Sequence, residues 1–192
     1  MKIIGITGSI ASGKSTIAEM IADRYNLPLL SVDDFSKNWI KLYERGVKHL
    51  FKVLEIPEEL TVQETLRKNI FKHEELKTIL ENIISKDFWR YVRTFNGQTK
   101  AIVIEHPILF EMSQAIHFDF IIGVDADLEL RKARMASRGY TPETIQERLD
   151  AQLNFNSYSA RVDIILDNNG PLTADEVCNK LSKSDEFKSL IS

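Results

Sequence analysis

The residues best suited to chemistry lie near the start of the sequence, in the segment Gly8-Ser9-Ile10-Ala11-Ser12-Gly13-Lys14-Ser15. The segment matches the phosphate-loop pattern G-x-x-x-x-G-K-[ST] at every fixed position, and Thr16 follows it. Glycines at these positions allow positive φ and bring backbone N–H groups close to an anion. The lysine can neutralise β- and γ-phosphates, and the hydroxyl of Ser15 can coordinate Mg²⁺. The pattern therefore predicts a binding site for ATP with Mg²⁺.

The residues on either side of this loop predict a strand before it and a helix after it. Residues 2–7 are mostly β-branched and indicate a buried parallel strand. Beyond Lys14, apolar residues at helical spacing continue to about Tyr25. A helix that begins near Gly13 adds unpaired N–H groups and the positive end of its dipole to the site. The alternative is a glycine-rich strand-to-helix turn that binds nothing.

The composition limits the class of protein. Of 192 residues, 25 are basic and 28 acidic, and the formal charge of -3 gives no reason to expect nucleic-acid binding. The apolar runs are too short to span a membrane, and the first strand leaves no room for a signal peptide. The single cysteine, Cys178, cannot form an internal disulfide and suits a reducing compartment, with buried packing as its expected role. We expect a cytoplasmic monomer or weak oligomer.

Acidic residues follow two further predicted strands. Residues 27–32 indicate a second strand that ends at Asp33, and residues 101–104 indicate a third that ends at Glu105. Ligands of open α/β sheets bind beyond the carboxyl ends of the strands, so we expect Asp33 near the phosphate loop. Its alternative role is a helix N-cap. Glu105 could hold a Mg²⁺-bound water or contact the acceptor, or it could be a satisfied carboxylate at a helix end.

The remaining pattern completes an α/β protein with a five-stranded parallel sheet. Residues 118–124 and 162–166 indicate the fourth and fifth strands. Between residues 35 and 95 only helical patterns occur, with a probable capping box at Thr61 and Glu64. A second pattern of this kind, Thr173-x-x-Glu176, opens what we expect to be the last helix. We predict a nucleotide-binding core of residues 1–34, 97–138 and 161–192, a helical acceptor-binding domain of residues 35–96 and a lid of residues 139–160.

Basic residues follow the fourth predicted strand, on a helix that breaks at Gly139. Another helix begins at Thr141 with a proline in its first turn, and on it Arg148 and Gln152 would share a face. Guanidinium groups on a closing lid would neutralise a phosphoryl group in transit, and closure would exclude water. A solvated charged face is the alternative. The lid candidates are Arg134, Arg138, Arg148 and Gln152, of which the first two are assigned to catalysis.

Several segments together resemble the dephospho-coenzyme A kinase family over almost the whole chain. The phosphate loop is common to many kinases, whereas two other segments are more specific. Glu105-His106-Pro107-Ile108-Leu109-Phe110-Glu111 is similar to the family's Asp-x-Pro-Leu-Leu-Phe-Glu, and Asp167-Asn168-Asn169-Gly170 is similar to its final strand-to-turn signature. Ser31-Val32-Asp33 stands where the family has Asp-x-Asp. Residues 66–71 and the four lid candidates also match the family pattern.

This resemblance implies a P-loop kinase of the nucleoside-monophosphate-kinase type, with a core, a helical acceptor domain and a lid. Its expected activity is phosphorylation of the ribose 3′-hydroxyl of dephospho-coenzyme A by ATP. Asp33 would accept the hydroxyl proton, Lys14 and the lid arginines would neutralise the γ-phosphoryl, and Asn168 would lie near adenine. Arg138 is also expected to contact ATP. The residues expected to bind the acceptor are Asp33, Lys86, Glu105, Arg148 and Gln152.

The departures from the family pattern lie on the acceptor side. Ser85-Lys86 replaces a His-Pro pair, and Glu64 and Tyr158 replace basic residues. Lys86 could restore the positive charge lost with that histidine. The pantetheine arm of the acceptor would need apolar surface, for which the candidates are Trp39, Phe88 and Trp89.

Two alternative functions remain open. One is a related kinase with a different acceptor, such as a deoxynucleotide. The other is a nucleotide-dependent binding switch without an acceptor. The sequence lacks the Asn-Lys-x-Asp signature of guanine specificity, and a switch gives no reason for a helical insertion beside an arginine-bearing lid.

Overall fold

The computed structural model describes residues 1–70, 72–110, 112 and 114–192. They form two compact units. The core unit comprises Met1–Val32 and Gly97–Ser192, and the helical unit comprises Asp33–Asn96. Phe71 and Glu111, which belong to the segments that carry the family resemblance, lie outside the described residues.

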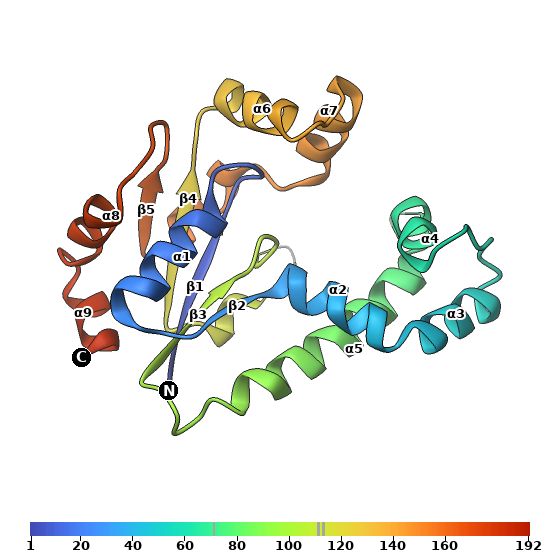
Figure 1. Cartoon of the computed structure of the whole chain (residues 1–192), viewed down its shortest axis with the longest axis horizontal. Helices are drawn as coiled ribbons and strands as arrows, with labels where there is room; N and C mark the ends of the chain where they lie inside the picture. Colours follow the sequence, from blue (N-terminus) through green and yellow to red (C-terminus); the bar gives the residue numbers. More distant parts are fainter. Residues whose placement is uncertain (71, 111, 113) are drawn as a thin grey trace. The chain divides into compact units, whose positions relative to one another are not determined.

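The core unit is built on a parallel sheet whose strands, among the described residues, follow the order β2-β3-β1-β4-β5 (Figure 1). The central strand, β1, carries Ile4 and Ile6, which have no exposed surface. This burial on both sides explains why β1 is a nearly continuous apolar run. The strands are β1 (Lys2–Gly8), β2 (Leu29–Ser31), β3 (Ala101–Glu105), β4 (Phe120–Asp125) and β5 (Ile164–Asp167).

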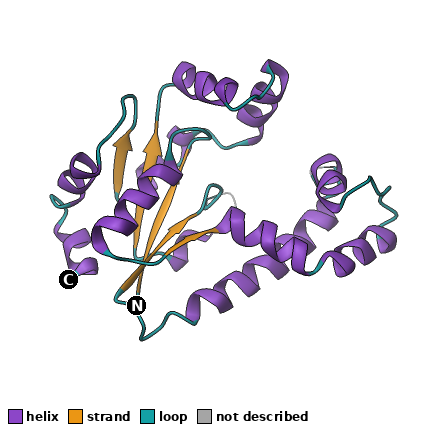
Figure 2. Ribbon diagram, viewed as in Figure 1, coloured by secondary structure: helices purple, strands orange, loops and turns teal. Residues whose placement is uncertain are grey.

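Three helices of the core unit pack against one face of this sheet (Figure 2). Helix α1 (Lys14–Tyr25) presents Ile17 and Ile21 to Ile4 and Ile6 of β1. Burial of each such side chain contributes about 1.5–3 kcal/mol. This packing fixes α1 against the sheet, so its N-terminus lies at the end of β1. The other two helices are α8 (Ala174–Leu181), which carries the buried Cys178 as predicted, and α9 (Asp185–Ile191).

A smaller apolar cluster lies on the opposite face of the sheet. Ile121 alternates with the side chains of β4 that face α1, so it points to the other side. It packs with Leu109, Phe110, Phe155 and Tyr158. These residues lie between strands or in short 3₁₀ turns, so the cluster anchors the irregular segments between β3 and β4 and before β5 to the sheet. The turns are Gln114–His117, Phe155–Ser157 and Ser159–Arg161.

Two helices follow β4, and the second of them lies within the segment predicted as the lid, residues 139–160. Helix α6 (Leu128–Ser137) ends before Gly139, whose φ of 84° suits a residue without a Cβ. Helix α7 (Pro142–Ala151) begins with the Thr141 hydroxyl, which accepts a hydrogen bond from the Thr144 N–H at 3.3 Å. Gln152 lies one residue beyond α7 and has extended backbone, with φ of -99° and ψ of 140°. The prediction that Gln152 shares a helix face with Arg148 is therefore wrong.

The helical unit has its own apolar core, which includes Val47, Phe51, Leu66 and Leu76. The predicted capping box is confirmed: the Thr61 hydroxyl accepts from the Glu64 N–H, and the Glu64 carboxylate accepts from the Thr61 N–H. Glu64 thus has a structural role that accounts for its departure from the family pattern. The helices are α2 (Val32–Leu42), α3 (Glu44–Val53), α4 (Val62–Asn69) and α5 (Glu74–Arg93).

The predicted fold class, an α/β protein with a parallel sheet and helices, is confirmed. The errors lie at the ends of elements, where the bounds of strands two, four and five are displaced by one or two residues. The capping box at Thr173 opens α8, but α9 follows it, so the expectation of a last helix there is wrong. In the described part of the chain, no helix is both long and apolar enough to cross a membrane.

Candidate active site

The loop after β1 turns sharply because two glycines adopt positive φ. Gly8 has φ of 144°, and a Cβ on it would lie 1.9 Å from the Val124 carbonyl oxygen of the neighbouring strand. Gly13 has φ of 98°, and a Cβ there would lie 2.3 Å from Nδ2 of Asn168. Any other residue would therefore open the loop at either point. Gly13 is also the N-cap of α1, so the positive end of this helix lies within the loop.

Lys14 is buried although it carries a charge. Its side chain is 7% exposed, and Nζ donates a hydrogen bond to the Ser9 carbonyl at 2.9 Å. The Ser12 N–H donates to the same carbonyl at 3.1 Å. The ammonium group thus lies inside the turn of the loop, where it can serve an anion bound to the loop.

Arg134 of α6 holds the second half of the loop. Its guanidinium donates to the carbonyls of Ala11 at 3.3 Å and Ser12 at 3.1 Å, and to the Asn168 carbonyl at 2.9 Å. Asn168 in turn donates from Nδ2 to the Ser12 carbonyl at 2.7 Å. Arg134 and Asn168 therefore bind the side of the loop formed by its carbonyls and link it to β5.

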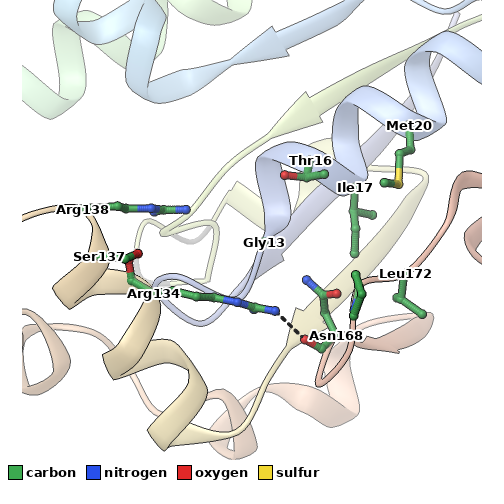
Figure 3. Close-up of a pocket in the computed structure, with 10 residues that line it drawn as sticks. Gly13, Thr16, Ile17, Met20, Arg134, Ser137, Arg138, Asn168 and Leu172 are labelled. Carbon is green, nitrogen blue, oxygen red and sulfur yellow. Dashed lines mark hydrogen bonds between the residues drawn. The ribbon is translucent and has the colours of Figure 1, made fainter.

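A cavity of about 350 Å³ adjoins this junction. Figure 3 shows Arg134 and Arg138 extending from α6 towards Gly13, with Asn168 opposite. The walls combine charged and apolar surface, which is suited to a phosphate-bearing molecule with a flat base. Its lining residues are Gly13, Thr16, Ile17, Met20, Arg134, Ser137, Arg138, Asn168, Pro171 and Leu172.

Two carboxylates at the ends of strands contact hydroxyl groups of the loop region. The Ser15 hydroxyl donates to Oε1 of Glu105, at the end of β3, at 2.7 Å. The Ser9 hydroxyl donates to Oδ1 of Asp125, at the end of β4, at 2.6 Å. The structure thus brings Ser15 and Glu105 together, as their positions in the sequence suggested. Asp125 was missed, although its position at a strand end was the same signal that identified Glu105.

His106 follows Glu105 and is 3% exposed. Among the described residues its Nδ1 atom has no hydrogen-bond partner, and its ring lies edge-on to Phe118 at 6.4 Å between centroids. Burial lowers the pKa of this imidazole to about 4, because the charged form would lose its hydration. The group is therefore neutral at physiological pH.

The four lid candidates differ in their surroundings. Arg134 binds the loop backbone, and Arg138 lines the cavity. The Arg148 guanidinium lies 4.6 Å from the centre of the Tyr140 ring. The Gln152 carboxamide contacts the phosphate loop: Oε1 accepts from the Ile10 N–H at 2.6 Å, and Nε2 donates to the Gly8 carbonyl at 3.2 Å.

Two of the residues predicted to serve the acceptor, Asp33 and Lys86, lie on α2 and α5. Asp33 is exposed in the first turn of α2, which begins at Val32, so the alternative of an N-cap role does not hold. Lys86 is exposed on α5. Phe88 is 2% exposed, so its proposed contribution to an apolar surface is wrong. It packs edge-on against Phe35 within the helical unit.

The fold and the loop together define a P-loop kinase. A phosphate loop follows the central strand, carboxylates lie at the ends of neighbouring strands, and a helix pair that carries arginines contacts the loop.

The comparisons with known proteins identify the family. The family model described as dephospho-CoA kinase matches residues 2–174. A dephospho-CoA kinase of Prochlorococcus marinus (strain MIT 9312) is 34% identical over 179 residues, which cover 86% of each chain. The chain belongs to the dephospho-CoA kinase family.

Solved structures agree with this fold. Thermus thermophilus TT1252 has a TM-score of 0.82 and 28% identity, over 95% of this chain and 96% of that one. Dephospho-CoA kinase from Campylobacter jejuni has a TM-score of 0.67 and 23% identity, over 98% and 100% of the two chains. The second likeness supports the fold alone.

Proposed function

We propose that this protein transfers the γ-phosphoryl group of ATP to the ribose 3′-hydroxyl of dephospho-coenzyme A and so produces coenzyme A and ADP. One observation supports the donor half above all. Lys14 lies within a loop whose carbonyls are held by Arg134 and Asn168, and Gly13 in this loop caps helix α1, whose N-terminus suits phosphates. Membership of the dephospho-CoA kinase family supports the acceptor half.

The donor roles follow from charge and position. The N–H groups of the loop and the start of α1 would bind the β- and γ-phosphates, and Lys14 would offset the charge that develops between them. Arg138 lines the cavity beside Gly13 and would contact ATP and the phosphoryl group in transit. Asn168 borders the same cavity, which can receive the base of the nucleotide.

The oxygen donors near the loop fit a magnesium ion. Mg²⁺ is held in kinases by one or two protein oxygens together with phosphates and waters. The Ser15 hydroxyl and the Glu105 carboxylate lie 2.7 Å apart and would supply such oxygens. When bound, Mg²⁺ would partly neutralise the negative charge of the phosphates.

On the acceptor side, Asp33 would accept the proton of the attacking hydroxyl. The exposed Lys86 would attract the phosphates of the acceptor. The lid, with Arg148 and Gln152, would exclude water and so favour transfer over hydrolysis. We place the enzyme in the cytoplasm as a monomer or weak oligomer, in keeping with its one buried cysteine.

The direct test is incubation of the pure protein with Mg²⁺, labelled ATP and a panel of acceptors. The panel contains dephospho-coenzyme A, nucleoside monophosphates and deoxynucleotides, and mass spectrometry identifies the product. We expect transfer to dephospho-coenzyme A, with loss of that transfer in Lys14→Ala. Transfer to another compound alone would assign a different acceptor, and slow hydrolysis without transfer would favour a binding switch.

A further inference from the structure

The segment that leaves the lid is joined to the phosphate loop by one side chain. Oε1 of Gln152 accepts from the Ile10 N–H at 2.6 Å, and Nε2 donates to the Gly8 carbonyl at 3.2 Å. Nε2 also lies 3.4 Å from the Pro107 carbonyl. The carboxamide thus pairs with the loop on both sides of Ser9, as a peptide group would in a neighbouring strand.

The apolar side chains of the loop contact the lid as well. Ala11 packs with Met135 of α6 and Ile145 of α7 in one cluster, which also includes Ile10. Ala11 has φ of 59°, a left-handed conformation that is costly for a residue with a Cβ. The lid therefore holds part of the loop in a conformation that the isolated chain would rarely adopt.

Gln152 and Arg134 bind different backbone groups of the loop. Arg134 binds the carbonyls of Ala11 and Ser12, whereas Gln152 binds the carbonyl of Gly8 and the N–H of Ile10. A phosphate loop works only if its carbonyls point away from the anion. In the first half of the loop, the hydrogen bond from Gln152 holds the Gly8 carbonyl in this orientation.

We propose that Gln152 is a positioning residue that holds the backbone of Gly8 and Ile10 in the phosphate-binding conformation from the end of the lid. It acts on nucleotide affinity through the loop and does not touch the acceptor. This role explains why Gln152 leaves α7 with extended backbone: a further helical turn would turn the carboxamide away from the loop. The inference rests on the nucleotide-binding half of the proposed function.

The first variant is Gln152→Ala, compared with Gln146→Ala as a matched control. Gln146 belongs to α7, is exposed and donates to Asp150 within that helix at 2.8 Å. Two hydrogen bonds to the loop are lost in Gln152→Ala, so the Kd for ADP should rise at least about tenfold. The kcat/KM for ATP should fall equally. The Kd for dephospho-coenzyme A without nucleotide should stay unchanged, and Gln146→Ala should match the wild type in all three measurements.

The second variant is Gln152→Glu, which keeps the size of the side chain. The new carboxylate can still accept from the Ile10 N–H, but it has no donor for the Gly8 carbonyl and adds negative charge beside the anion site. ADP binding relative to wild type should be weakest at pH 8. It should recover as the pH falls towards the pKa of the new carboxyl group, which the Gly8 carbonyl and the bound anion raise above its ordinary value of about 4.3, because protonation restores a donor. ADP binding equal to that of the wild type at every pH would contradict the inference.

Titration calorimetry with ADP decides between the outcomes. An ADP Kd in Gln152→Ala equal to that of Gln146→Ala would overturn the inference, as would a change confined to the acceptor Kd. If Gln152→Ala does not fold, the pH dependence of Gln152→Glu gives the decision. If the wild type binds ADP but does not phosphorylate dephospho-coenzyme A, the acceptor assignment fails while the ADP data still test Gln152.

Discussion

Side chains 122 to 156 residues away in the sequence bind the backbone of the phosphate loop, whereas the apolar core of the helical unit is formed by the unit's own residues, between Trp39 and Ile84. In the loop, backbone groups have defined partners, and a Cβ at Gly8 or Gly13 has no room. In the helical unit, the charged candidates for acceptor binding lie on the surface. Donor chemistry therefore depends on tertiary structure that is hard to change, while acceptor contacts can change without altering the fold.

The departures from the family pattern follow this division. Glu64 completes a capping box, and Tyr158 is buried against Phe110, with ring centroids 4.8 Å apart. Both replacements therefore have structural partners. The half-buried Ser85 and the exposed Lys86 have no such explanation, so a change of acceptor would be expected first at this pair.

The largest effect is expected in the loop. Lys14→Ala removes the charge at the centre of the anion site, and charged groups that neutralise a transferring phosphoryl are worth about 10³–10⁵ in kcat. We expect turnover to fall by at least about 10³-fold in a coupled ADP-release assay. Near-normal turnover would contradict the donor assignment, and circular dichroism would check that the variant is folded.

The next effect concerns the proposed base, which follows β2 by two residues. Asp33→Asn removes the proton acceptor but keeps the side chain's size, so kcat should fall by about 10²–10⁴-fold with little change in ATP affinity. The matched control is Asp34→Asn, because Asp34 is also exposed in the first turn of α2 and pairs with Lys37 at 3.1 Å. If Asp34→Asn is the damaging change, the base is Asp34.

The third prediction tests the stability of the core unit through His106. Its pKa is lowered to about 4 from 6.5, so the unfolded chain binds a proton that the folded chain excludes between these values. The contribution of His106 to the free energy of unfolding should be constant above about pH 6.5 and should decrease as the pH falls to about 4, by about 3 kcal/mol in total.

Urea unfolding at several pH values measures this contribution. His106→Asn removes the titrating group, so the part of the pH dependence between 4 and 6.5 should become shallower in that variant. An unchanged slope would mean that His106 is hydrated in the folded protein.

The smallest effect is expected on the acceptor side. Lys86→Ala should raise the KM for dephospho-coenzyme A about tenfold, the lower end of what one hydrogen bond to a charged group contributes, and should leave the KM for ATP unchanged. Lys77→Ala, on the same helix, is the control; Lys77 lies 3.7 Å from Glu74. If the two variants have equal KM values for dephospho-coenzyme A, Lys86 is a surface lysine that does not bind the acceptor.

Local patterns in the sequence determined the phosphate loop, the strand and helix on either side of it, and two capping boxes. They were readable because each depends on residues within a few positions: a buried strand needs a short apolar run, and a capping box needs Thr and Glu three apart. The five strands were also identified, although their ends were displaced, because tertiary hydrogen bonding decides where pairing stops.

Only the tertiary structure decided which distant groups complete the site. Helical spacing placed Gln152 beside Arg148, yet Gln152 leaves the helix to bind Gly8 and Ile10. Arg134 was expected to act on a phosphoryl group, and the structure also gives it the carbonyls of Ala11 and Ser12. Such bonds join groups more than 120 residues apart in the sequence. These groups come within hydrogen-bonding distance only when the parallel sheet has formed.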